Sequence, residues 1–145
     1  SNVILIETNI KKQITGELST ALNVNYSYTK SVKKSSDYYG DPTFDKQIFY
    51  IPIELGKCNL NLNYKRSGIN LFYTFTGKRY INFENTEYLK AVDMFEGNIY
   101  QYIETGKINT QIRFEVNNIF NADYQIIAGY PMPLRNYKLS LNIEY

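Results

Sequence analysis

Four glutamates are the first residues to test for chemistry, because paired carboxylates can share acid and base or nucleophilic roles in catalysis. Two pairs are candidates: Glu84 with Glu87, and Glu115 with Glu144. We expect Glu115 and Glu144 to lie on the polar faces of consecutive strands, where Arg113 and Lys138 also lie. Opposite charges across a strand pair attract each other. The pattern therefore favours ion pairing over catalysis, and we predict no catalytic residue.

Histidine is absent and cysteine occurs once, as Cys58. A Ser-His-Asp or Cys-His apparatus therefore cannot be built from this chain. A Cys/His zinc cluster is excluded for the same reason, and an intrachain disulfide needs a second cysteine. We expect neither a metal nor a cofactor.

Charge and hydropathy exclude two further classes of protein. Lys and Arg total 16 against 14 Asp and Glu, a formal net charge of +2, which gives no electrostatic reason to propose nucleic acid as a partner. No stretch approaches the roughly 18 apolar residues of a membrane-spanning helix.

The start at Ser1 has no signal-peptide pattern, so we expect a processed, cut or truncated start.

Tyrosine is very abundant, with 15 residues, beside 8 Phe and no Trp. Its apolar ring and polar tip suit strands and the aromatic girdles at the two interfaces of an outer-membrane barrel. Soluble lectins and adhesins can also be rich in tyrosine. Composition alone leaves both classes open.

Polar and apolar residues alternate with a period of two along most of the chain, which predicts strands. The last run is the clearest: Tyr137, Leu139, Leu141, Ile143 and Tyr145 share one face, and Lys138, Ser140, Asn142 and Glu144 share the other. We predict about seven strands, in the ranges 3–12, 18–28, 48–65, 69–76, 94–103, 108–117 and 137–145. The early part of the third range, around Pro52, is expected to be irregular.

The predicted connections alternate in length. Short turns fall near Gly16, Gly68 and Gly106, and long polar loops fall at about 30–46, 82–93 and 118–133. Short turns at one end and long loops at the other are typical of bacterial outer-membrane barrels. A sheet with one face on a soluble core would show the same alternation of residues. Loop sorting, strand length and aromatic strand ends favour an all-β, antiparallel, up-and-down transmembrane β-barrel.

The C-terminal part of the chain contains two distinctive segments, FEVNNIFNADYQ (114–125) and GYPMPLRNYKLSLNIEY (129–145). They place an Asn-Asn-Ile-Phe-Asn turn before a Gly/Pro loop and an aromatic last residue. With these motifs this part of the chain resembles the end of a TonB-dependent outer-membrane receptor. The segment SGINLFYTFTGKRY (67–80) also resembles an earlier strand of these barrels. Such receptors have about 22 strands around a plug domain. The resemblance therefore implies that residues 1–145 are the C-terminal segment of such a barrel, without the plug.

The function implied by the resemblance is active import of a scarce nutrient, such as a ferric siderophore, heme or cobalamin, across the bacterial outer membrane. The implied partners are outer-membrane lipid, the remainder of the barrel and plug, TonB through the missing N-terminal part, and the outer-membrane assembly machinery. The long loops would face outward and contribute to ligand capture. Candidate ligand contacts are Tyr38, Tyr39, Asp41, Phe44, Tyr88 and Tyr130. Their alternative roles are interface contact or packing of loop on loop.

The last strand carries a separate expectation. The alternate residues Tyr137, Leu139, Leu141, Ile143 and Tyr145 resemble the signal read by the assembly machinery through strand addition. Lipid contact after folding is the other role of the same side chains. Two further classes stay open: a stand-alone small barrel with an eighth strand in the irregular parts, and a soluble β-sandwich or sugar-binding module.

Overall fold

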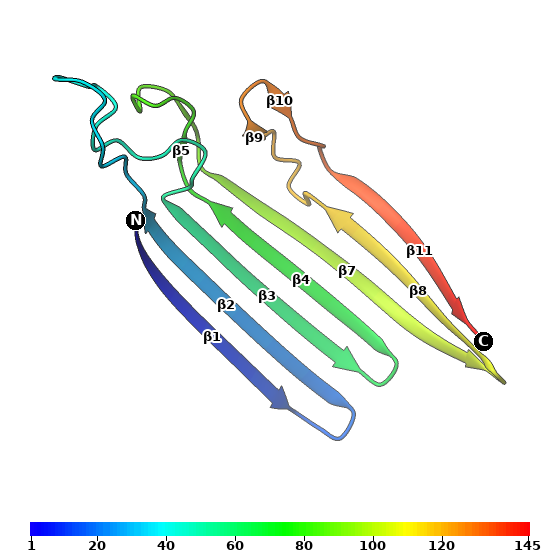
Figure 1. The fold of residues 1–145 in the computed structure, drawn as a ribbon. Helices are drawn as coiled ribbons and strands as arrows, with labels where there is room; N and C mark the ends of the chain where they lie inside the picture. The colour runs from blue at the N-terminus through cyan, green and yellow to red at the C-terminus, as the bar shows by residue number, and fades with distance from the viewer.

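The structure is a computed structural model that describes residues 1–145, and it contains one large antiparallel sheet of seven strands (Figure 1). In spatial order the strands are β1 (Asn2–Gln13), β2 (Leu18–Lys30), β3 (Glu54–Tyr64), β4 (Ser67–Thr76), β7 (Val92–Thr105), β8 (Ile108–Asn117) and β11 (Asn136–Glu144). Every neighbouring pair is antiparallel, so the topology is up-and-down. The all-β prediction and its count of seven strands are confirmed. No helix is long and apolar enough to cross a membrane.

Two small hairpins lie outside this sheet. β5 (Arg79–Tyr80) pairs with β6 (Tyr88–Leu89), and β9 (Gln125–Ile127) pairs with β10 (Tyr130–Pro131). Each hairpin belongs to one of the connections that the sequence predicts as a long loop. Neither adds a long eighth strand.

The boundaries of two predicted features differ from the structure. The third strand begins at Glu54 rather than near Ile48, since Tyr50 has a left-handed φ of 59° and Pro52 has no N–H for a ladder. The turn predicted at Gly68 is formed by residues 65–66, and Lys65 has the positive φ, at 52°. Gly68 lies inside β4, opposite Tyr100 of β7.

The cross-strand register produces one apolar and one polar face. Apolar rows include Leu22–Leu60–Leu71 and Ile69–Ile99–Phe114–Leu139, and a polar row is Ala21–Asn61–Asn70–Asn98–Glu115–Lys138. The alternation read from the sequence therefore continues in register across most of the sheet, with exceptions such as Leu5 and Phe72 on the polar face. Because the side-chain period is two, a slip of one residue in any strand would move its apolar side chains to the polar face.

The sheet has no hydrophobic core. No hydrophobic side chain is buried, and Leu139 on the apolar face of β11 is 73% exposed. The sheet is also not closed, because β1 and β11 each have a neighbour on one side only. The larger transmembrane barrel, of which this sheet is predicted to be the C-terminal part, therefore stays a prediction.

The connections sort by length onto the two ends of the sheet, as Figure 1 shows. At the turn end lie the short connections 14–17, 65–66 and 106–107, where Gly106 supplies a φ of 63°. At the loop end lie loop A (31–53), loop B (77–91, with β5 and β6) and loop C (118–135, with β9 and β10). Loop B begins at residue 77, five residues before its predicted start at 82, but the predicted sorting is otherwise found.

Candidate functional site

Loops A, B and C are joined to one another by hydrogen bonds at the loop end. The Tyr50 amide of loop A donates to the Tyr80 carbonyl of loop B at 2.7 Å. The Arg79 guanidinium of loop B donates to the Gln125 carbonyl of loop C at 2.9 Å. The Ala128 amide of loop C donates to the Tyr50 hydroxyl at 3.4 Å. The three loops therefore form one connected surface.

A reciprocal pair of hydrogen bonds holds loop A against loop B. The Gln47 amide donates to Asn85 Oδ1 at 2.7 Å, and Asn85 Nδ2 donates to the Gln47 carbonyl at 2.8 Å. The Gln47 side chain accepts from the Ser31 amide at 3.0 Å, and both residues are buried. Beside this pair, the rings of Phe49 and Phe83 meet edge to face at 4.5 Å.

Asp41 is a buried carboxylate that organises loop A. One oxygen accepts from the Thr43 hydroxyl at 2.6 Å and the Thr43 amide at 2.9 Å. The other accepts from the Asp37 amide at 3.1 Å and Lys33 Nζ at 3.0 Å. Hydrogen bonds from Thr43, then from Asp37 and Lys33, hold the pKa of Asp41 well below its ordinary value. Both oxygens are occupied inside the loop.

Arg79 is the most deeply placed cation of the loop end. It is 6% exposed, and burial lowers its pKa from the ordinary value. Its Nε has no hydrogen-bond partner, so only part of the guanidinium is satisfied. Next to it, Lys78 Nζ lies over the rings of Tyr80, at 4.7 Å, and Tyr88, at 5.0 Å.

The predicted ligand contacts divide into exposed aromatics and one buried acid. Five aromatic residues are exposed, from 47% for Phe44 to 105% for Tyr39. Loop A carries Tyr38, Tyr39 and Phe44, loop B carries Tyr88, and loop C carries Tyr130. Tyr88 also packs against Tyr80, with ring centroids 6.5 Å apart. The others make no ring contact with one another.

Sequence reasoning missed the residues that join the loops: Gln47, Phe49, Tyr50, Arg79, Phe83 and Asn85. One signal was available, because the apolar run 48–53 stands out within a polar connection. Its period does not distinguish a strand entry from a packed loop. The reciprocal bonds between Gln47 and Asn85 have no local sequence signal.

On the polar face of the sheet, Tyr100 of β7 lies across Gly68 of β4. A Cβ on Gly68 would come within 2.3 Å of the Tyr100 ring, so only glycine leaves room for it. The Tyr100 hydroxyl donates to Asn63 Oδ1 on β3 at 2.6 Å, and the Arg113 guanidinium of β8 lies 5.6 Å from the ring. This contact accounts for an aromatic residue, Tyr100, on the polar face of β7.

The candidate carboxylate pair of the strands, Glu115 with Glu144, is not brought together. Glu115 lies opposite Lys138, and Glu144 lies opposite Asn109, six residues farther along β11. At about 3.4 Å per residue they are on the order of 20 Å apart. Lys138 Nζ is 3.2 Å from Glu115, so the predicted ion pairing is present. No group of three or more His, Cys, Asp or Glu side chains is arranged to hold a metal ion.

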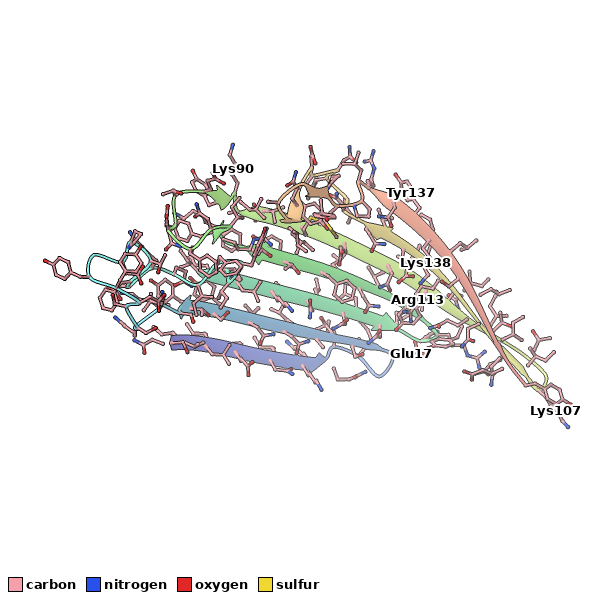
Figure 2. The ribbon with its side chains drawn as sticks, turned by 45° about the horizontal axis from the view of Figure 1, so that its top comes forward. Glu17, Lys90, Lys107, Arg113, Tyr137 and Lys138 are labelled. Carbon is pink, nitrogen blue, oxygen red and sulfur yellow. The ribbon has the colours of Figure 1, made fainter.

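The apolar face of β11 is uncovered. The five predicted residues Tyr137, Leu139, Leu141, Ile143 and Tyr145 are 61% to 94% exposed. Figure 2 shows Tyr137 near the loop end of β11 and Lys138 next to it. Tyr145 lies just past the strand, which ends at Glu144.

No protein-family model and no curated protein matches this chain. Among solved structures, the chain is similar to BauA, the ferric preacinetobactin receptor from Acinetobacter baumannii. The TM-score is 0.71 at 12% sequence identity, and the match covers 97% of this chain and 26% of the BauA chain. The chain thus spans about a quarter of the length of the receptor it matches. The likeness shows that the two proteins share the fold of this sheet.

Proposed function

We propose that this chain is part of the wall of a bacterial outer-membrane β-barrel transporter, which binds and imports a scarce nutrient and is driven by TonB. The observation that carries the proposal is the apolar face, which extends over all seven strands with no protein to cover it. Burial of apolar surface is the main stabilising term of a folded protein. Here the acyl chains of the bilayer supply the cover, and the polar face lines the lumen.

The strand lengths support a membrane-spanning sheet. The seven strands have 9 to 14 residues, against the roughly 9–11 tilted residues that cross a bilayer. Short turns at one end and long loops at the other support periplasmic and extracellular ends respectively. The loop-end surface with its exposed aromatics then faces the medium.

The directions of the edge strands support a larger barrel. Because seven strands alternate in direction, β1 and β11 run the same way, and pairing them with each other would be parallel. An all-antiparallel closure therefore needs an odd number of additional strands, and bacterial single-chain barrels have even totals. The remainder of the barrel, with its plug, is the proposed partner at both edges. The coverage of BauA, about a quarter, agrees with this size.

The proposed ligand class is a ferric siderophore, with heme or cobalamin as members of the same nutrient group. Support comes from the likeness to a ferric preacinetobactin receptor, together with aromatic side chains exposed on all three loops. Such rings can stack on a flat or bulky ligand. The proposed process is transport without bond-making chemistry, so the chain is not an enzyme.

The proposed role of the last strand is recognition by the outer-membrane assembly machinery. The free edge and uncovered apolar side chains of β11 are suited to strand addition. Lipid contact follows once the barrel has closed.

The two other classes find little support. A β-sandwich needs a second sheet over the apolar face. The other two sheets are hairpins whose strands have only two or three residues each. A stand-alone small barrel needs a long eighth strand, which the loops do not contain.

The test is made on the complete protein in its own bacterium. Carbonate extraction and flotation of membranes should recover the protein with the outer membrane. Uptake of radioiron-labelled siderophores should fall when its gene is deleted, and collapse of the proton gradient should abolish the remaining gene-dependent uptake. Recovery in the soluble fraction would overturn the membrane role, and unchanged uptake of siderophore, heme and cobalamin would overturn the transport role.

A further inference from the structure

A hollow lies on the apolar face near the turn end. Its volume is ≈ 610 Å³, and its floor includes Leu62, Ile69, Ile99, Ile112 and Phe114 from β3, β4, β7 and β8. The volume is within the usual range of roughly 300–1,000 Å³ for small-molecule sites. In Figure 2, β8 and β11 bend away from β1–β4 toward the turn at Lys107.

A second hollow adjoins the first, and its lining is polar. Its volume is ≈ 640 Å³, and it shares Tyr64, Ser67 and Gln101 with the apolar hollow. It adds two cations, Lys65 and Arg66, at the β3–β4 turn. An apolar hollow therefore opens directly into a charged one at the end of the sheet.

The charges around the second hollow are balanced and accessible. Lys65 Nζ is 3.2 Å from Glu17, and Arg66 pairs with Glu104. Each of these four side chains is between 51% and 57% exposed. Lys65 Nζ also lies 5.4 Å from the centre of the Tyr64 ring, which forms the border between the two hollows.

We propose that the two hollows together bind one zwitterionic phospholipid of the phosphatidylethanolamine type. This inference rests on the proposed function, which places the apolar face in a bilayer. An acyl chain fills the apolar hollow, and the phosphate lies against Lys65 and Arg66. The headgroup ammonium lies against Glu17, which lines the second hollow. Because Glu17 and Glu104 already balance Lys65 and Arg66, a zwitterionic headgroup leaves the local charge balanced, whereas an anionic headgroup would add a net negative charge beside the two carboxylates.

Native mass spectrometry of the complete protein, released from its membrane in mild detergent, tests the proposal. The wild type should retain a phosphatidylethanolamine molecule. The single variants Lys65→Gln and Arg66→Gln should each lower retention about fivefold. This factor corresponds to roughly 1 kcal/mol for a basic side chain at a membrane surface. Ile99→Trp should also lower retention, because the indole fills the apolar hollow.

Matched controls separate the site from general effects. Lys107→Gln removes a turn-end cation that lines neither hollow, and Leu22→Trp adds an indole to the same face outside them. Both should retain phospholipid as the wild type does. Equal retention in the wild type and all five variants, or retention of anionic lipid alone, would overturn the proposal.

Flotation of the same membranes keeps this inference distinct from the proposed function. Protein that floats with the membrane and retains no phospholipid overturns the lipid site only. Protein that does not float at all overturns the membrane role on which the site rests.

Discussion

The loop end and the strands of this molecule are stabilised in opposite ways. The buried polar residues Ser31, Asp41, Gln47, Arg79 and Asn118 all lie in or beside loops A, B and C. The strands bury no hydrophobic side chain. The loop end therefore satisfies most of its buried polar groups internally, while the sheet leaves the apolar side chains of one face exposed. Under the proposed function, this difference assigns the loops to water and one face of the sheet to lipid.

The free edge of β11 gives the largest expected effect. We predict that Tyr145→Asp in the complete protein abolishes most outer-membrane assembly, because a charge replaces the terminal aromatic residue of the proposed signal. Western blots of membrane fractions would measure it, with Glu144→Gln on the opposite face as the control. Normal assembly of the Asp variant would show that β11 carries no signal.

A charge placed on the apolar face tests whether this face of the sheet contacts lipid. Leu60→Arg lies in the apolar row between Leu22 and Leu71, and we expect it to lower the free energy of unfolding in bilayers by about 2–4 kcal/mol. Asn61→Arg, one residue away on the polar face, should cost less than about 1 kcal/mol. Urea titration of protein folded into vesicles measures both. Equal effects at the two positions would mean that the apolar face does not meet hydrocarbon.

The contact of Tyr100 with Gly68 gives an effect of intermediate size. We expect Gly68→Ala to destabilise the folded protein by about 1–3 kcal/mol, since the new methyl group meets the Tyr100 ring. Gly16→Ala is the control, because nothing lies within 4 Å of its Cβ position. Adding Tyr100→Ala to Gly68→Ala should recover part of the loss. If the double variant is no more stable than the single one, the ring contact is not the cause.

The smallest effect is local to loop A. Asp41→Ala should increase proteolytic cleavage within residues 31–53 several-fold while leaving unfolding of the sheet unchanged, because the carboxylate bonds only within this loop. Limited proteolysis with mass spectrometry measures it, and Asp37→Ala, at a more exposed partner of Lys33, is the control.

The pH dependence of loop A follows from the lowered pKa of Asp41. A carboxyl with a lowered folded pKa contributes its full stability above the ordinary value of 3.8 and loses it as the pH falls toward the folded value. Loop A should therefore resist cleavage equally at pH 7 and pH 5, and become sensitive only well below pH 3.8. A neutral protease reports this at pH 7 and pH 5 and pepsin reports it at acid pH, and sensitivity that begins near pH 5 would contradict it.

Most of the sheet could be predicted from the sequence because its two faces differ in polarity along most strands. The period of two places Leu139 and Lys138 correctly, and the register then follows from matching apolar faces. The entry to β3 could not be placed, since the apolar run 48–53 fits both a strand and a packed loop. The burial of Asp41 and the meeting of Tyr100 with Gly68 depend on residues distant in sequence or on loop geometry, for which local patterns carry no signal.

Cys58 provides a direct test of whether the apolar face of the sheet lies in lipid and the polar face lies in water. Cys58 is the only cysteine and lies on the apolar face between Val24 and Tyr73, while its neighbour Asn59 lies on the polar face. The measurement is power saturation of a nitroxide at Cys58, compared with one at Asn59→Cys in a Cys58→Ser background, with the complete protein in vesicles and any cysteine outside these 145 residues replaced by serine. We predict that oxygen relaxes the label at 58 and a water-soluble nickel complex relaxes the label at 59. Relaxation of both labels by the nickel complex would contradict the account.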